Sequence, residues 1–297
     1  MWKGVFPAVT TKFKEDGALD HAEMERCFAL QFEADVDGMI VCGSLGENMT
    51  LDPDEKIEIL KIAKSVSRGK PVLMTICESA TRRGKAAAVA AAKAGADGFM
   101  VLPGVPYKSA PAETINHIRA VAVAGERPVM VYNNPVGYGV DVTIPMFEEL
   151  AKDDQVVAMK ESTDDIRRVT EVFNTFGNRF DVFTGVDNLA LESLMMGADG
   201  WVAGLVVAFP KETVAIYKLA KAGRYDEARA IYRWFRPLLD LDVSTFLVQQ
   251  IKLAEIFAIG SNDRVREPRL PLSGEHRARV TKIIETALAN RPALPAL

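Results

Sequence analysis

Eight short apolar runs, separated by longer amphipathic stretches, constrain the fold of this chain more than any other feature. The runs are rich in Val, Ile, Met and Phe and show little alternation, as expected of strands that are buried on both faces. Helical patterns lie between them, for example at 54–65 and 81–94. Eight strands that each precede a helix predict an α/β fold, the (β/α)8 TIM barrel. The runs cover residues 4–10, 38–43, 71–77, 98–103, 128–133, 156–161, 180–185 and 200–204.

The competing fold is a doubly wound open sheet, and the end of the chain differs from both architectures. An open sheet would usually carry a glycine-rich phosphate turn after its first strand, and residues 4–11 contain none.

After about residue 222 the strand pattern stops, and only helical patterns follow. We therefore predict a catalytic barrel domain over residues 1–222 and a C-terminal helical extension over residues 223–297. The helical patterns of the extension cover 225–241, 245–259 and 274–288.

Composition argues against several classes of partner. The 297 residues carry a formal net charge of -4 without a basic cluster, which argues against nucleic acid. No apolar stretch approaches the roughly 18 residues that a membrane span requires, and the N-terminus lacks the apolar core of a signal peptide. Cys27, Cys42 and Cys77 lie in apolar segments and are interpreted as reduced thiols of a cytoplasmic protein. The three histidines are isolated, so no metal site is expected.

Lys160 ends the sixth apolar run, directly after four apolar residues. A lysine at such a strand tip lies where water is scarce, and desolvation disfavours its ammonium form, so the amine can act as a nucleophile. The chemistry that requires a neutral lysine in a pocket is Schiff-base formation with a carbonyl substrate. The alternative is a lysine that extends from the strand end to solvent.

Two other strand ends carry polar groups, and the active site of such a barrel lies at the carboxyl ends of its strands. The second run ends in Gly43-Ser44-Leu45-Gly46-Glu47, a turn that exposes backbone N–H groups and a hydroxyl together and suits a carboxylate. An ordinary strand-to-helix turn is the alternative, with Glu47 as a helix N-terminal charge. Tyr132 ends the fifth run and is either a proton relay or a packing residue with one hydrogen bond.

Together these motifs resemble those of the dihydrodipicolinate synthase / N-acetylneuraminate lyase family of class I aldolases, which use a lysine Schiff base. The Gly-hydroxyl-X-Gly-Glu motif matches residues 43–47, Tyr-Asn-X-Pro matches 132–135, and Lys-Glu-Ser matches 160–162. The resemblance extends over nearly the whole chain. It implies that Lys160 forms the imine with a 2-oxo acid or a cyclic imine, and that Tyr132 is the general acid/base.

The resemblance also implies the surroundings of the imine. Ser44 and the backbone N–H of Leu45 hold the substrate carboxylate, and Gly185 and the backbone of Val202 line the pocket. No metal or organic cofactor is implied, because the protonated imine is itself the electron sink. Members of the family are commonly tetramers built from dimers, so a homotetramer is expected, with Tyr107 directed towards a neighbouring subunit's site.

Two departures from the family pattern bear on the substrate. Dihydrodipicolinate synthases proper carry two threonines in the second-strand motif and an arginine shortly after the tyrosine motif. Here Ser44 and Leu45 replace the threonines, and residues 135–139 contain no arginine, so condensation with aspartate semialdehyde is not expected. Sugar-acid members usually present small polar residues around these positions, where this chain has Leu45, Met49, Val136 and Tyr138.

The sequence looks most similar to the branch that acts on the hydroxyproline-derived Δ1-pyrroline-4-hydroxy-2-carboxylate. Those enzymes release water and ammonia to give 2-oxoglutarate semialdehyde, and this dehydratase/deaminase activity is the first hypothesis. An aldolase or dehydratase that uses pyruvate, of the dihydrodipicolinate synthase type or acting on a 2-keto-3-deoxy sugar acid, is the second. A non-catalytic sensor of a small acid is the third, although the intact set of Lys160, Tyr132 and Ser44 argues against it.

Overall fold

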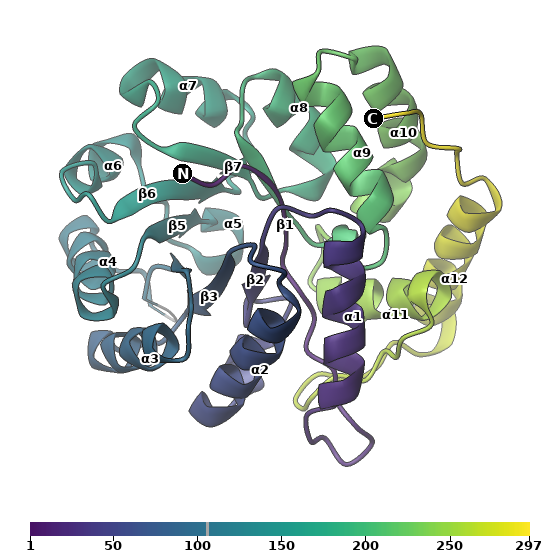
Figure 1. Cartoon of the computed structure of the whole chain (residues 1–297), viewed down its shortest axis with the longest axis horizontal. Helices are drawn as coiled ribbons and strands as arrows, with labels where there is room; N and C mark the ends of the chain where they lie inside the picture. The colour runs from purple at the N-terminus through teal and green to yellow at the C-terminus, as the bar shows by residue number, and fades with distance from the viewer. Residues whose placement is uncertain (105–106) are drawn as a thin grey trace.

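The computed structural model of the chain describes residues 1–104 and 107–297 and shows eight strands surrounded by helices (Figure 1). Each strand lies inside the apolar run that predicted it. All strand pairs are parallel. The strands are β1 (Gly4–Pro7), β2 (Met39–Val41), β3 (Val72–Ile76), β4 (Gly98–Val101), β5 (Val129–Asn133), β6 (Val156–Glu161), β7 (Asp181–Thr184) and β8 (Gly200–Ala203).

The strands follow one another around a barrel in the order β1-β8-β7-β6-β5-β4-β3-β2. The two ends of this order meet where Ala8 forms a parallel bridge with Ile40, and the N–H of Val9 donates to the Ile40 carbonyl at 3.1 Å. The predicted (β/α)8 barrel with C-terminal helices is therefore confirmed. Its carboxyl-terminal rim gathers residues that are far apart in the sequence, because all strands point the same way.

Helices cover the outside of the barrel (Figure 1). Within the described residues, no helix has both the length and the apolar character needed to cross a bilayer. The helices between the strands are α1 (His21–Glu33), α2 (Pro53–Val66), α3 (Thr81–Lys93), α4 (Pro111–Gly125), α5 (Pro135–Tyr138), α6 (Ile144–Leu150), α7 (Arg167–Phe176) and α8 (Ala190–Met195). After β8 come α9 (Pro210–Lys221), α10 (Tyr225–Leu239), α11 (Leu247–Ile259) and α12 (Gly274–Ala289).

Side chains of each strand alternate between two apolar cores. One core lies between the sheet and the helices, and the other fills the barrel interior. On β5 and β6, Met130, Tyr132 and Ala158 belong to the interior core, whereas Val131 and Met159 belong to the outer one. The strand period of two therefore points Lys160, two residues after Ala158, into the barrel mouth.

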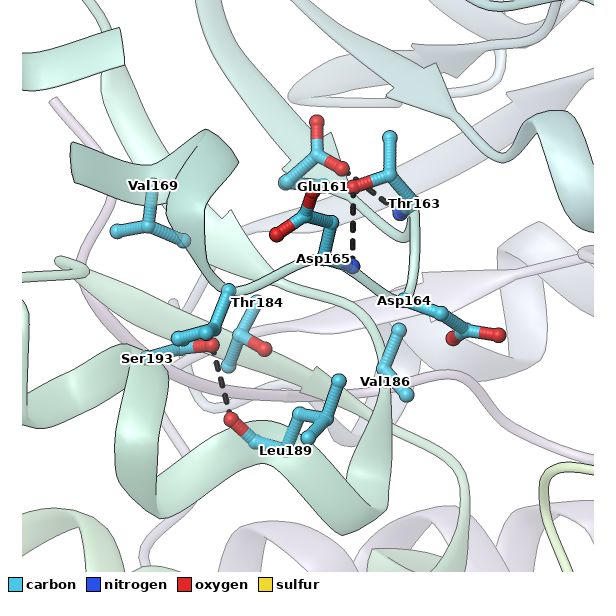
Figure 2. A pocket seen from close by; sticks show the side chains of 10 residues that line it. Glu161, Thr163, Asp164, Asp165, Val169, Thr184, Val186, Leu189 and Ser193 are labelled. Carbon is cyan, nitrogen blue, oxygen red and sulfur yellow. Dashed lines mark hydrogen bonds between the residues drawn. The ribbon is translucent and has the colours of Figure 1, made fainter. Parts of the chain in front are cut away.

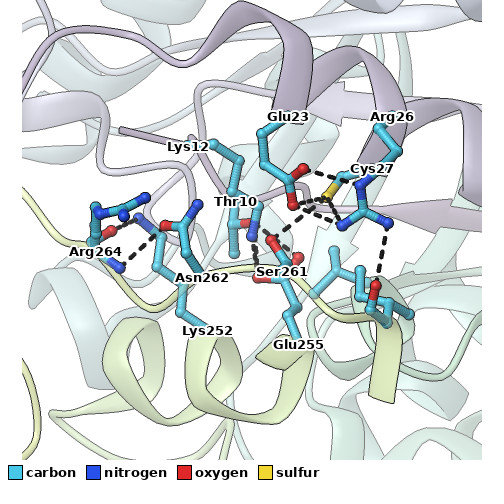
Figure 3. A network of polar contacts seen from close by, with 12 residues as sticks. Thr10, Lys12, Glu23, Arg26, Cys27, Lys252, Glu255, Ser261, Asn262 and Arg264 are labelled. Atoms are coloured by element: carbon cyan, nitrogen blue, oxygen red, sulfur yellow. Dashed lines mark hydrogen bonds and ion pairs between the residues drawn. The ribbon is translucent and has the colours of Figure 1, made fainter. Parts of the chain in front are cut away.

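A buried network of charges fixes α11 against the barrel, and Figure 3 shows the part of it around Thr10, Lys12 and Glu255. Lys12 Nζ lies 2.6 Å from Glu255 Oε2, and Lys252 Nζ lies 2.5 Å from Glu47 Oε1, with all four side chains at most 1% exposed. Thr10 Oγ1 also donates to Glu255 at 2.9 Å. Buried charges are stable only when they are paired in this way. Glu47 thus anchors the C-terminal helices; it also stands at the N-terminus of the short 3-10 helix Asn48–Thr50, where its side chain makes no capping hydrogen bond.

Candidate active site

Lys160 lies at the bottom of a cavity of about 590 Å³ at the carboxyl-terminal rim of the barrel. Its side chain is 7% exposed. Burial lowers the pKa of the Lys160 amine to about 8, although the carboxylates of Asp242 and Asp187 act in the opposite direction. At pH 7.5 roughly a quarter of the amine is then neutral, against about one part in a thousand for an ordinary lysine. The amine is therefore suited to attack a carbonyl or imine carbon.

Tyr132 stands beside Lys160 because the two residues are register partners on β5 and β6. Lys160 Nζ lies 4.0 Å from the centroid of the Tyr132 ring. The Tyr132 hydroxyl accepts a hydrogen bond from Asn134 Nδ2 at 3.0 Å. Burial raises the pKa of the phenol to about 12, so it carries its proton at neutral pH. In this state Tyr132 can donate a proton next to the amine.

The turn after β2 brings Ser44 and Leu45 into the same cavity, opposite β6 in the barrel. Cys42 and Glu47 adopt left-handed backbone conformations, with φ of 57° and 59°, on either side of this turn. In the described ranges 1–104 and 107–297, the backbone N–H groups of Ser44 and Leu45 donate to no protein acceptor. These donors and the Ser44 hydroxyl are available to a carboxylate.

Tyr138 is the hydrogen-bond partner of Ser44, a pairing that the sequence did not reveal. Its hydroxyl contacts Ser44 Oγ, and its ring packs edge-on against Tyr132 with 5.7 Å between the ring centroids. Burial raises the pKa of the Tyr138 phenol as well. Two protonated phenols thus lie between the turn after β2 and Lys160.

Gly185 and Val202 also line the cavity. A Cβ on Gly185 would collide with the Lys160 side chain and with Ser162 Oγ, so only glycine leaves room for Lys160 there. Ser162 is buried, and its hydroxyl has no hydrogen-bond partner among the described residues. This unpaired hydroxyl faces the same cavity and was missed from the sequence.

Tyr107 lies outside this cavity in the single chain. Its side chain is 57% exposed and lines a separate cavity of about 460 Å³ together with Ser79 and His117. The expected contribution of Tyr107 to a neighbouring subunit's site therefore stays a prediction.

Two carboxylates near Lys160 come from segments that carry no motif. Asp187 is fully buried and accepts hydrogen bonds from Trp201 Nε1 at 2.9 Å and from the backbone N–H of Leu205 at 2.8 Å. Asp242 comes from the loop between α10 and α11 and lines the cavity directly. Burial raises the pKa of both carboxyl groups. Neither residue lies in a local sequence pattern that predicts a site.

An arginine does lie near the second-strand turn, in contrast to what residues 135–139 suggested. Arg269, from the segment between α11 and α12, lines an adjoining cavity of about 310 Å³ that shares Ser44 and Tyr138 with the first. Its guanidinium is 3.7 Å from Glu47 Oε2. Residues 135–139 themselves supply no cation, whereas Arg269 brings one to the adjoining cavity from a distant part of the chain.

A small hollow lies on the opposite side of the Lys160 strand (Figure 2). Glu161 points there and accepts a hydrogen bond from the backbone N–H of Thr163 at 2.7 Å. This hollow has a volume of about 10 Å³, enough for one water and no substrate. The hydrogen bonds of the Glu161 carboxylate fix the end of β6 and thereby the position of Lys160. In the described part of the chain, no group of three or more His, Cys, Asp or Glu residues is arranged to bind a metal ion.

Comparisons with known proteins agree with this geometry. The model of the dihydrodipicolinate synthetase family matches residues 1–287. The 4-hydroxy-tetrahydrodipicolinate synthase of Pelodictyon phaeoclathratiforme is 31% identical over 285 residues, which cover 94% of this chain and 95% of the relative. The structure of the synthase of that name from Methylacidiphilum fumariolicum SolV is similar with a TM-score of 0.90 and 25% identity, covering 98% of each chain. YagE, a prophage protein of this family from E. coli K12, gives a TM-score of 0.91 and 26% identity, with 97% and 99% of the two chains covered.

Proposed function

This chain belongs to the dihydrodipicolinate synthetase family, and we propose that it is a lyase in which Lys160 forms a Schiff base with its substrate. The observation that carries the proposal is the buried Lys160 amine, with a pKa of about 8, in one cavity with Tyr132 and Ser44. A protein that only senses a small acid has no need of such a nucleophile. The structure of YagE in complex with pyruvate supports a 2-oxo acid or a compound of similar shape as the substrate.

The catalytic roles follow from the positions of the side chains. The neutral Lys160 amine attacks the carbonyl or imine carbon, and Tyr132 donates and then recovers the proton that moves between the reacting atoms. Ser44 and the free N–H groups of the turn hold the substrate carboxylate. Gly185 and Val202 shape the wall next to the imine.

The substrate that we favour is Δ1-pyrroline-4-hydroxy-2-carboxylate, which the enzyme dehydrates and deaminates to 2-oxoglutarate semialdehyde. This compact ring carries one carboxylate, which the second-strand turn can bind. Leu45 and Val136 give the cavity an apolar surface that suits the ring. Each hydroxyl group of a polyol chain that is buried against Leu45 or Val136 without a hydrogen-bond partner would cost roughly 1–3 kcal/mol.

Two reactions measured on one preparation test this substrate. We expect ammonia release from Δ1-pyrroline-4-hydroxy-2-carboxylate and negligible condensation of pyruvate with aspartate semialdehyde. Ammonia and 2-oxoglutarate semialdehyde are quantified in the first reaction, and the cyclic condensation product in the second. Efficient condensation without ammonia release would assign the chain to the synthases instead.

The second candidate function is 4-hydroxy-tetrahydrodipicolinate synthase, because curated relatives carry that name and Arg269 lies beside the turn. A guanidinium there is a suitable partner for a second carboxylate. If this candidate is right, Arg269→Ala raises the KM for aspartate semialdehyde and leaves pyruvate trapping at Lys160 unchanged. The ion pair of Arg269 with Glu47 means that part of its charge is already compensated, which favours the first candidate.

We also propose that the protein is a homotetramer made of two dimers. Exposed apolar side chains at the carboxyl-terminal rim support a covering partner there: Met49, Tyr107 and Val136 follow β2, β4 and β5 and are 65%, 57% and 69% exposed. Sedimentation velocity at micromolar concentration should give the mass of four chains. A monomer under these conditions would contradict the proposal and remove any role of Tyr107 in a neighbouring site.

The cytoplasm is the compartment that we propose for this activity. Cys27, Cys42 and Cys77 are all free and buried, and burial raises the pKa of each thiol. Such cysteines act as small apolar core residues and are compatible with a reducing environment.

A further inference from the structure

The loop 240–246 connects α10 to α11. Among the described residues of this loop, Asp242 is the one with an acidic side chain that lines the cavity of Lys160. The buried network of Glu47, Lys252, Lys12 and Glu255 fixes α11 and thereby holds this loop over the rim. The loop therefore adds a carboxyl group to a site whose other polar groups come from the strand ends.

The Asp242 carboxyl lies directly over the backbone of Gly204, at the end of β8. A Cβ on Gly204 would collide with Asp242 Oδ1, so the absence of a side chain there makes room for the carboxyl group. The N–H of Gly204 meanwhile donates to Asp187 at 3.1 Å. Gly204 thus separates two carboxylates that both influence Lys160.

The two carboxylates differ in their partners. Asp187 accepts hydrogen bonds from Trp201 and from backbone N–H groups and is therefore saturated. For Asp242, no hydrogen bond or ion pair to a carboxyl oxygen exists within residues 1–104 and 107–297. A half-buried carboxyl group without a protein partner is free to receive a ligand's hydrogen bond.

The charges around the cavity point to a cationic ligand group. Among the described lining residues, Lys160 is the one cation, while Asp242 and Asp164 are the acids. Asp164 is exposed at the rim, whereas Asp242 is half-buried beside Lys160. A substrate nitrogen close to Lys160 would experience repulsion from the imine cation unless an anion lay nearby.

We propose that Asp242 is the specificity-determining residue that receives the substrate nitrogen, an inference that rests on the cyclic-imine substrate proposed above. The neutral Lys160 amine attacks C2 of the protonated ring imine and forms the Nζ–C2 bond. A proton then moves from Nζ to the ring nitrogen, and the C2–nitrogen bond breaks with its electron pair on nitrogen. The products are the lysine iminium and a primary amine, still joined to C5, which takes up a proton from water. The lysine iminium and the ammonium group, two cations beside Asp242, favour its ionised form, and the Asp242 carboxylate holds the ammonium group.

This role predicts that Asp242 matters only for substrates that contain nitrogen. Two probes separate the cases: Δ1-pyrroline-2-carboxylate has the ring nitrogen and lacks the hydroxyl, and pyruvate has no nitrogen. Both are expected to give a borohydride-stable adduct on Lys160, and the rate of adduct formation is read by mass spectrometry of quenched samples. Asp242→Asn keeps the shape of the side chain and removes its charge. Asp240→Asn removes an exposed charge from the same loop and serves as the matched control.

We expect Asp242→Asn to slow adduct formation with Δ1-pyrroline-2-carboxylate by about tenfold or more, the loss of a charge-assisted hydrogen bond. Adduct formation with pyruvate should stay at the wild-type rate or increase, because loss of the nearby anion lowers the pKa of Lys160. Asp240→Asn should change neither rate. Equal slowing with both probes would show that Asp242 only supports Lys160, and no slowing with either would overturn its role.

The trapping test of Asp242 and the ammonia-release test of the proposed deaminase activity can fail independently of each other. If the wild type traps Δ1-pyrroline-2-carboxylate but releases no ammonia from the hydroxylated substrate, the deaminase proposal fails and the nitrogen-binding role of Asp242 stands on the trapping ratio. If the wild type traps pyruvate but not Δ1-pyrroline-2-carboxylate, the role of Asp242 is overturned.

Discussion

Replacing Lys160 with alanine is expected to abolish the borohydride-stable adduct and to lower kcat by about four to six orders of magnitude. The reason is that no other described lysine lines the cavity, so no second amine can take over the attack. The mass of the wild type after pyruvate and borohydride should increase by one three-carbon unit at Lys160. An adduct of the same yield on Lys160→Ala, or turnover at a comparable rate, would contradict the Schiff-base mechanism.

Two controls make this result specific. Lys160→Arg keeps a cation between Asp187 and Asp242 but has no amine that can be deprotonated, so it should also form no adduct. In the wild type, the rate of adduct formation should rise with pH around a midpoint of about 8, because the neutral amine is the nucleophile and its fraction grows as pH passes the pKa. A midpoint near the ordinary lysine value would show that burial of Lys160 does not lower its pKa.

Replacing Tyr132 with phenylalanine is expected to lower kcat by roughly two to four orders of magnitude, the usual effect of losing a general acid/base. The substitution keeps the ring next to Lys160 and removes the hydroxyl that accepts from Asn134. Because the Tyr132 phenol has a pKa of about 12, it is protonated at neutral pH and acts first as a proton donor. Adduct formation should therefore slow as well, which stopped-flow or quenched trapping measures.

Tyr217→Phe is the matched control for the loss of a phenol. The Tyr217 hydroxyl donates to the Asp199 carbonyl at 2.9 Å, away from the cavity, so its removal should leave kcat unchanged. If Tyr132→Phe also retains the wild-type kcat while both variants unfold at similar temperatures, Tyr132 is a packing residue and another group moves the proton. Tyr138, bonded to Ser44, would then be the first alternative.

The arrangement of the barrel could be predicted because it depends on local patterns. Strands that are buried on both faces must be apolar throughout, so each strand is visible as a short run of Val, Ile, Met and Phe. The lysine, tyrosine and serine motifs stand at the ends of such runs. Parallel strands in a barrel bring their carboxyl ends to one rim, and this rule alone places Lys160, Tyr132 and Ser44 near one another.

The relation of these motifs to the rest of the chain could not be predicted in the same way. Glu47 pairs with Lys252, which is 205 positions away, and no sequence window contains both residues. The arginine that was sought after the tyrosine motif has a counterpart in Arg269, which approaches the second-strand turn only after the C-terminal helices have packed. A local sequence motif therefore does not reveal which cation lies near this turn.

By itself the sequence determined the (β/α)8 fold, the C-terminal helices and the three motifs, because apolar periodicity and strand-end position are properties of short segments. Only the tertiary structure decided the electrostatics of the site. The pKa of Lys160 depends on how completely water is excluded and on two carboxylates, Asp187 and Asp242, that the fold brings beside it. Asp242 reaches the cavity because a buried ion-pair network fixes α11 on the barrel. Desolvation and charge proximity act through space, so they exist only once the chain has folded.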